Sequence, residues 1–258
     1  MTPWQRNAAN LAASLDFYGR ATGRGAIEEG AGVHLIASGA PMSVLNMALL
    51  STPVSHAEGE IERRIGLAAA WFRRRGTPWS FWLGEDWLPP RISRRLDEIF
   101  DRFELAPVTE SPGMETEALP PPSRELPEIE ARRVTTRDDG EAFAHLLSIN
   151  FQIPGLYARD LYSSPRAWGA GAEGWLGMVD GAAVATTVIV EAAGAAGIYS
   201  VSTNPGWRRR GYAEALMRAA LGERARGRVL LQSSRAGLRL YQKMGFRRVT
   251  RFFVYGSV

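Results

Sequence analysis

A run of prolines near the middle of the chain constrains its fold more than any other feature. Pro120, Pro121 and Pro122 follow one another directly, and Pro127 comes shortly after them. Successive prolines cannot lie inside a helix or a central strand, because they lack amide hydrogens and their rings clash with the preceding turn. The segment therefore predicts a stiff, extended linker over 120–128. We expect it to join one domain at 1–119 to a second at 129–258.

The composition is that of a globular protein with a buried core, since hydrophobic residues make up 45% of the chain and charged residues 22%. Cysteine is absent, which excludes disulfides, thiolate metal sites and cysteine nucleophiles. The three histidines, at 34, 56 and 145, have no spacing typical of metal ligands on one helix. We therefore expect no metal, and neither a zinc hydrolase nor a serine–histidine hydrolase.

The positive charge is concentrated near the C-terminus. The whole chain has a net charge of +4. Residues 205–258 contain 13 basic and two acidic side chains, whereas the remainder is net acidic. This distribution predicts an anionic ligand for the C-terminal segment. A solvated basic face is the alternative that the charge alone leaves open.

Hydrophobic spacing predicts a similar order of helices and strands in the two halves. The first half has expected helices at 4–18, 57–75 and 91–103, and expected strands at 33–37, 43–50, 79–83, 105–109 and 114–119. The second half has expected helices at 138–149, after Pro154, at 212–224 and at 236–244, and expected strands at 129–135, 175–179, 183–190, 198–203, 228–232 and 249–255. Asp180–Gly181 predicts a hairpin turn between two of these strands. The similarity suggests two copies of one α/β fold.

The loop that follows the strand at 198–203 is the best candidate for binding an anion. A helix is expected to open at about Arg210. The first amides of a helix have no intrahelical partners, and the helix dipole adds partial positive charge there. A phosphate could satisfy these donors, and Gly211 and the small Ala213 would let it approach the backbone closely.

This loop resembles the phosphate-binding motif of the GNAT superfamily of acyl-CoA-dependent N-acyltransferases. The family pattern is Arg/Gln-x-x-Gly-x-Gly/Ala, which Arg208, Gly211 and Ala213 match. Three other matches occur in the chain, but none of them lies between an expected strand and the start of a helix. The glycine pattern at 169–174, which is similar to a dinucleotide-binding motif, is excluded for the same reason, because it does not open an expected helix.

A second motif resembles the same family. The segment 240–246 reads Leu-Tyr-Gln-Lys-Met-Gly-Phe and is similar to the Leu-Tyr-x-x-x-Gly-Phe ending of the family's fourth helix. The two motifs occur in the family's order, and the resemblance covers about 129–258. The chain departs from the family at Ser234, where many members have asparagine, and at Gly237, where alanine is frequent.

The resemblance implies an α/β fold with two GNAT-like domains in tandem, each with a mixed central sheet and flanking helices. It also implies acetyl-CoA as the co-substrate, with the pyrophosphate on backbone amides at 209–213 and the pantetheine arm along the strand edge at 201–203. The implied cofactor-binding residues are Val201, Ser202, Thr203, Arg208, Arg209, Arg210, Gly211, Tyr212, Ala213 and Ser234.

The resemblance also implies a catalytic role for Tyr241. A thiol with a pKa of ~8.5 leaves more easily when a nearby hydroxyl donates a proton to it. The alternative is that Tyr241 is a core aromatic residue of its helix. We nominate no general base. The nearest acids in the sequence are Glu173, Asp180 and Glu191, and each is expected to be a turn or surface residue.

The acceptor is expected between the first two helices and the last strands of the second half. Aromatic residues occur there at 151, 157, 162 and 168, and core packing is the preferred reading for each of them. The first half has Ser51-Thr52-Pro53 in place of the glycine pattern and lacks the second motif. We therefore expect it to be a degenerate GNAT-like domain that does not bind coenzyme A.

The sequence thus predicts an N-acetyltransferase in which an amine attacks acetyl-CoA directly and Tyr241 is the general acid. A non-catalytic acyl-CoA-binding module for sensing or assembly is the alternative. The longest apolar stretch, 182–190, is far shorter than the ~20 residues that span a bilayer, and no targeting signal is evident. We expect a cytoplasmic protein with a small-molecule or peptide amine as its partner, no nucleic acid and no membrane. The oligomeric state stays open, with a homodimer among the options.

Overall fold

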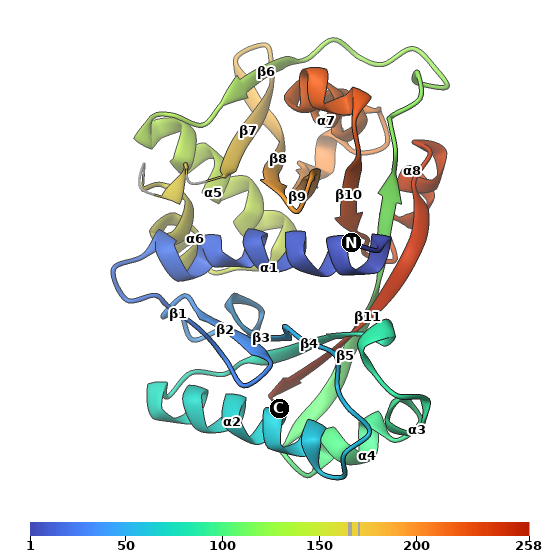
Figure 1. Cartoon of the computed structure of the whole chain (residues 1–258). Helices are drawn as coiled ribbons and strands as arrows, with labels where there is room; N and C mark the ends of the chain where they lie inside the picture. The colour runs from blue at the N-terminus through green and yellow to red at the C-terminus, as the bar shows by residue number, and fades with distance from the viewer. Residues whose placement is uncertain (165–166, 170, 258) are drawn as a thin grey trace.

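The computed structural model describes residues 1–164, 167–169 and 171–257 (Figure 1). Within these residues the strands form one mixed sheet in the order β1-β2-β3-β4-β11-β5-β10-β9-β8-β7-β6. The strands of the first half are β1 (Ala26–Gly30), β2 (Val33–Ala37), β3 (Asn46–Leu50), β4 (Ser80–Gly84) and β5 (Leu105–Thr116). Those of the second half are β6 (Glu130–Arg133), β7 (Ala172–Val179), β8 (Ala182–Ala192), β9 (Ala195–Thr203), β10 (Val229–Gln232) and β11 (Arg247–Ser257).

Helices cover both faces of this sheet. They are α1 (Pro3–Ala21), α2 (Glu60–Arg75), α3 (Pro90–Ser93), α4 (Leu96–Asp101), α5 (Arg137–Phe151), α6 (Gly155–Tyr162), α7 (Tyr212–Leu221) and α8 (Leu238–Lys243). The alternation of side chains along β8 explains how the two layers form. Val188 and Val190 pack in the core beneath α5, whereas Ile189 between them packs in the core beneath α7.

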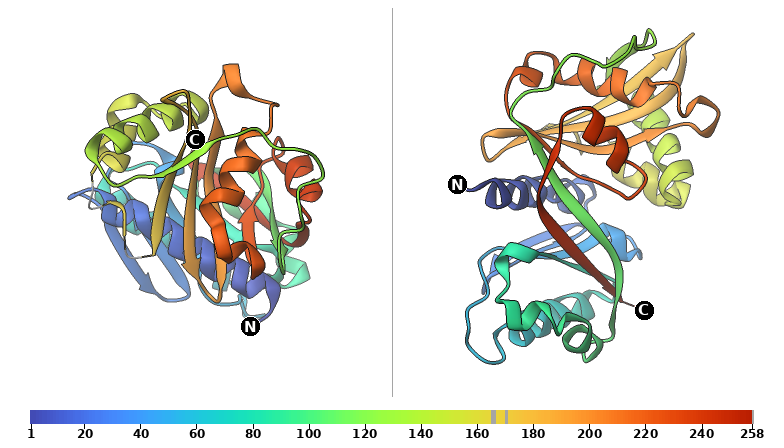
Figure 2. Two further views of the ribbon diagram at one scale, coloured as in Figure 1. Left: turned by 90° about the horizontal axis from the view of Figure 1, so that it is seen from above. Right: turned by 90° about the vertical axis from the view of Figure 1, so that its right-hand side faces the viewer.

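The two halves exchange their last strands. β11 lies between β4 and β5, and β5 lies between β11 and β10 (Figure 2). Phe253 of β11 pairs with Leu83 of β4, and Leu231 of β10 pairs with Met114 of β5. The sheet is therefore continuous through both halves of the chain. The division into domains at 1–119 and 129–258 stays a prediction.

Most of the expected elements are present, and the differences have local causes. The strand β1 was not predicted, because its sequence Ala-Ile-Glu-Glu-Gly is polar and it lies at the edge of the sheet. The two short strands expected at 105–109 and 114–119 are one long strand, β5, in which a register shift near Pro107 accommodates the proline. The helix expected at 91–103 is broken into α3 and α4.

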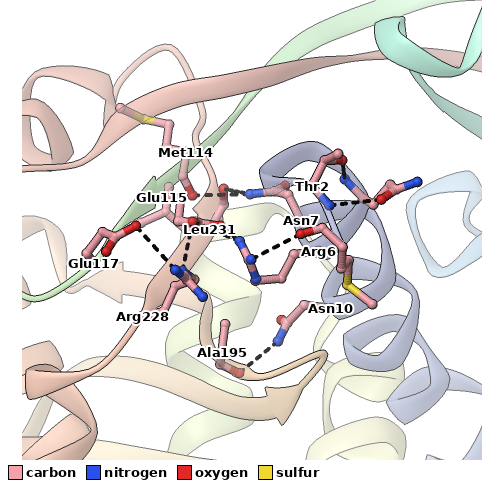
Figure 3. Close-up of polar contacts among 12 residues, drawn as sticks. Thr2, Arg6, Asn7, Asn10, Met114, Glu115, Glu117, Ala195, Arg228 and Leu231 are labelled. Atoms are coloured by element: carbon pink, nitrogen blue, oxygen red, sulfur yellow. Dashed lines mark hydrogen bonds and ion pairs between the residues drawn. The ribbon is translucent and has the colours of Figure 1, made fainter.

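The first helix crosses the sheet between the two halves and packs on strands of both (Figures 1 and 2). Its buried polar side chains bind backbone carbonyls of both halves, as Figure 3 shows. Asn7 donates to the carbonyl of Met114 at 3.1 Å, and Asn10 donates to that of Ala195 at 3.2 Å. Arg6 forms a buried ion pair with Glu115 at 2.9 Å. These contacts hold α1 against β5 and β9.

Candidate functional site

The loop between β9 and α7 leaves a series of backbone amides without partners. Arg209 has a φ of 62° and Gly211 a φ of 99°, so the chain turns twice through the left-handed region before the helix. Among the described residues the amides at 209–211 form no backbone hydrogen bond, and no side chain caps the helix at Gly211. The first amides of α7 also lack intrahelical partners. The loop can therefore bind a diphosphate through its backbone.

A groove of 830 Å³ runs past this loop. It brings together all but one of the residues that the sequence singled out. These are Val201, Ser202, Thr203, Arg208, Arg209, Gly211, Tyr212, Ala213, Ser234 and Tyr241. The exception is Arg210, which does not line the groove and whose guanidinium lies 5.6 Å from the centre of the Trp207 ring.

The strands β9 and β10 separate beside the groove. They pair only at Val229↔Ala196 and Leu230↔Gly197, so the later part of β9 has no strand partner on that side within the described residues. A bulge centred on Ser200, with a φ of 49°, shifts the register of β9 against β8. The unpaired edge at 201–203 can accept the amide groups of a pantetheine arm as an added strand would.

Two of the predicted cofactor residues use their side chains to hold the backbone. Arg208 donates to the carbonyl of Thr203 at 3.1 Å and to the side chain of Asn150 at 2.6 Å. The hydroxyl of Ser202 is buried and lies 2.8 Å from that of Thr186. Arg208 therefore fixes the loop against α5, and Ser202 can offer its backbone to a ligand in the groove.

Tyr241 lies on α8 at the wall of the groove. Its side chain is 8% exposed, and burial raises the pKa of its phenol to about 12. The phenol is therefore protonated at neutral pH and can donate a proton. Gly237 leaves room for this ring, since a Cβ there would lie 2.8 Å from Cε2 of Tyr241. Ser234 accepts a hydrogen bond from the amide of Gly237 at 3.2 Å and so helps to start the helix.

The linker contributes a residue that the sequence did not single out. A Cβ on Gly211 would lie 2.9 Å from Cδ of Pro127 and 3.1 Å from Nη2 of Arg124, so the linker passes directly beside the loop. Arg124 lines the groove together with Ser123. The sequence predicts this segment only as a linker between the two halves. The one available signal was an arginine next to the proline run.

A second cavity, of 450 Å³, adjoins the groove, and Phe151 and Ser234 line both. We call it the interdomain pocket after the predicted division of the chain, because its walls come from α1, β3, β4 and β5 of the first half and from α5, α6, β8 and β9 of the second. Tyr162 donates to the hydroxyl of Tyr18 at 3.1 Å inside it. Burial raises the pKa of both phenols, so both are neutral.

The predicted aromatic residues lie in this pocket and in the core. Phe151 and Tyr162 line the interdomain pocket, and Tyr162 also packs in the core beneath α5, as expected. Tyr157 and Trp168 pack against the core beneath α5, which agrees with the core packing predicted for them.

The acids near the groove are engaged. Glu173 pairs with Arg133 and Arg224, and Glu191 also pairs with Arg224. Glu214, which lines the groove, pairs with Arg218 at 2.8 Å. Asp180 lies in the turn between β7 and β8. In the part of the chain that the structure describes, no group of three or more acidic or histidine side chains is arranged to hold a metal ion.

Comparisons with known proteins agree with this geometry. A family model described as "Acetyltransferase (GNAT) domain" matches residues 156–248. No curated protein sequence matches the chain. Within the described residues, no helix is both long and apolar enough to cross a membrane.

Solved structures with similar folds span nearly the whole chain. A GCN5-related N-acetyltransferase from Kribbella flavida is 18% identical with a TM-score of 0.69, and the match covers 97% of this chain and 95% of that one. One from Sphaerobacter thermophilus is 20% identical with a TM-score of 0.59, covering 89% and 81%. A tandem GNAT protein from the clavulanic acid biosynthesis pathway is 13% identical with a TM-score of 0.56, covering 98% and 93%.

These matches confirm the resemblance that the two motifs suggested. The family model includes the loop at Gly211 and the segment at Tyr241, which the structure brings into one groove. Residues 156–248 thus match a GNAT acetyltransferase domain, and the chain as a whole has the mixed α/β fold of solved GNAT proteins, a tandem GNAT protein among them.

Proposed function

We propose that the chain is an N-acetyltransferase that transfers the acetyl group of acetyl-CoA to an amine. One observation carries this proposal: a loop of unpartnered amides, an unpaired strand edge and a protonated tyrosine line a single groove. Coenzyme A needs each of them, because it has a diphosphate, an amide-containing arm and a thiol. No metal takes part in the proposed reaction.

The amides at 209–213 would bind the diphosphate, and the free edge at 201–203 would align the pantetheine arm. Arg124, Arg239 and Lys243 also line the groove and make it cationic. An anionic cofactor therefore gains favourable electrostatic energy on entering it.

The proposed reaction is a direct attack. The amine nitrogen forms a bond to the thioester carbonyl carbon, the carbon–sulfur bond breaks, and the amine gives up a proton to water. Tyr241 donates its proton to the departing sulfur and regains one from water, and general-acid help of this kind typically contributes ~10²–10⁴ in rate. We nominate no general base among the side chains.

Two differences from the groove of the second half support the role of the first half as a degenerate GNAT-like domain without coenzyme A. Its parallel strands β3 and β4 pair at Met47↔Ser80, Ala48↔Phe81 and Leu49↔Trp82, which leaves a shorter unpaired edge than the nine-residue β9 has against β10. The carboxylate of Glu60, in the first turn of α2, accepts hydrogen bonds from Ser55 and Arg64. The Glu60 carboxylate therefore occupies the amide of Ser55 in the loop before α2, whereas among the described residues no side chain caps the loop before α7.

The test is thiol release from acetyl-CoA in the presence of a panel of primary amines. An enzyme releases coenzyme A only when an accepted amine is present, and mass spectrometry finds the acetylated amine. The alternative, a non-catalytic acyl-CoA-binding module, binds acetyl-CoA with every amine left unmodified. The cytoplasmic location is a separate proposal, which cell fractionation tests. Gel filtration measures the oligomeric state.

A further inference from the structure

The interdomain pocket meets the cofactor groove at the bulge in β9. Tyr199 and Ser200 line the pocket, and the next three residues of the strand line the groove. Because the bulge at Ser200 turns the strand, adjacent residues of one strand face the two cavities. A group held in the pocket can therefore reach a thioester that lies along the β9 edge.

The walls of this pocket are mainly apolar and come from both halves of the chain. The first half contributes Leu11 and Leu15 of α1, Met47 of β3 and Trp82 of β4, and the second half contributes Leu147 and Val188. A volume of 450 Å³ is within the range that holds a small organic molecule. Burial of a ligand's apolar surface against these side chains contributes about 25 cal/mol of binding free energy per Å².

Among the described lining residues, the polar groups of the pocket are neutral or already paired, except for the exposed guanidinium of Arg235. The hydroxyls of Tyr18 and Tyr162 are bonded to each other, and that of Tyr199 donates to Asn10 at 2.6 Å. The one carboxylate among the described lining residues, Glu110, is paired with Arg251 at 3.1 Å. The interior therefore offers no free carboxylate to a second ammonium group.

An amine that enters such surroundings loses its proton more easily. Burial in an apolar site disfavours the charged form and lowers the pKa of an amine. Burial therefore increases the fraction of the amine that is uncharged and able to attack, in a site where the nearby carboxylates are held in ion pairs. It acts only on an acceptor whose body fills the pocket and excludes water.

We propose that the interdomain pocket binds the acceptor, and that the acceptor is a small primary amine carried on an apolar body, aromatic or alicyclic. This inference rests on the proposed function and narrows its substrate class. It excludes polyamines, because they would place a second ammonium group among apolar or engaged side chains. The first half then has a role in recognising the acceptor, although it lacks a cofactor site.

The first experiment compares 2-phenylethylamine with spermidine and lysine. Thiol release from acetyl-CoA should give a kcat/KM at least tenfold higher for 2-phenylethylamine. Spermidine or lysine used equally well or better overturns the inference. Titration of 2-phenylethylamine into the protein without cofactor, followed by tryptophan fluorescence because Trp82 lines the pocket, tests the pocket even if no amine turns over. No saturable signal in a protein that binds acetyl-CoA also overturns it.

The second experiment fills the pocket from its exposed side. Val44 lines the pocket and is 52% exposed, so Val44→Trp adds bulk without overpacking the core. It should raise the KM for 2-phenylethylamine at least tenfold and leave the Kd of acetyl-CoA unchanged. Leu67→Trp on α2 is the matched control, because Leu67 is 44% exposed and lies outside both cavities. Equal KM values for Val44→Trp and the control place the acceptor elsewhere.

Discussion

Replacing Asn10 by alanine removes the side chain that holds the first helix on the sheet. Asn10 is fully buried, and its amide nitrogen donates to the carbonyls of Val190, Ala192 and Ala195 at 3.3, 2.9 and 3.2 Å. Its oxygen accepts from the hydroxyl of Tyr199 at 2.6 Å. A buried polar group left without a partner costs about 1–3 kcal/mol. Since the hydroxyl of Tyr199 and a backbone carbonyl would lose their partner, we expect the free energy of unfolding to fall by about 2–4 kcal/mol.

The geometry also predicts how a second substitution combines with this one. A Cβ on Gly197 would lie 2.0 Å from the side-chain oxygen of Asn10, so Gly197→Ala forces the two apart. Overpacking of this kind typically costs about 1–3 kcal/mol. In a chain that already has Asn10→Ala, that oxygen is gone, and the Tyr199 ring, whose Cε2 lies 2.6 Å from the same Cβ, is no longer hydrogen-bonded to residue 10 and can move aside. The double variant should therefore lose at least about 1 kcal/mol less than the sum of the single losses.

Urea unfolding followed by circular dichroism measures each loss from the midpoint and slope. Gly23→Ala is the matched control, because nothing lies within 4 Å of a Cβ there, and its stability should change by less than about 0.5 kcal/mol. Additive losses in the double variant, or a loss below about 0.5 kcal/mol for Asn10→Ala, would refute the account of how α1 is held.

Three further predictions concern the groove and the first half. Tyr241→Phe should lower kcat by about 10²-fold or more while the Kd of acetyl-CoA changes little, because only the proton donor is lost. Arg124→Ala should weaken acetyl-CoA binding about five- to tenfold at low salt and less at high salt, since the guanidinium is exposed and screened. Burial alone would lower the pKa of His34, but hydrogen bonds and charges of Asp16 and Glu29 raise it above its usual value. The stability that this group contributes is therefore full below about pH 6.5 and is lost as the pH rises through the raised pKa, so His34→Gln should cost more at pH 6 than at pH 9.

Each of these has a control and a contrary result. An unchanged kcat in Tyr241→Phe removes the acid role. Arg226→Ala makes the same charge change outside the groove, and an equal loss of affinity there would mean that Arg124 acts only through net charge. Equal costs of His34→Gln at both pH values would show that the ion pairs with Asp16 and Glu29 do not stabilise the fold.

Local patterns were enough to predict the loop at Gly211 and the elements around it. The alternation of apolar residues in β8 and the spacing along α7 specify each element within a short window, and the Asp180–Gly181 turn takes up the positive φ values that its sequence predicts. The second motif placed Tyr241 near the same groove. Each of these signals lies within one element and its adjoining loop.

Contacts between distant segments could not be predicted in this way. The exchange of β5 and β11 depends on which strand edges meet, and no periodicity along either strand records its partners. Arg124 lies beside Gly211 only because the linker returns across the groove. The interdomain pocket combines side chains from both halves of the chain, so neither half alone contains its pattern.

The central claim is that the amides around Gly211 bind the diphosphate of acetyl-CoA. Isothermal titration of acetyl-CoA into the wild-type chain and into Gly211→Ala tests it most directly. The added Cβ would lie within 3.1 Å of Pro127 and Arg124, at a φ of 99° that alanine rarely adopts, so it should distort the loop. We predict one acetyl-CoA per wild-type chain and at least tenfold weaker binding by a Gly211→Ala variant whose circular dichroism is unchanged. Two acetyl-CoA molecules per chain, no binding, or equal affinity in the two proteins would contradict the account.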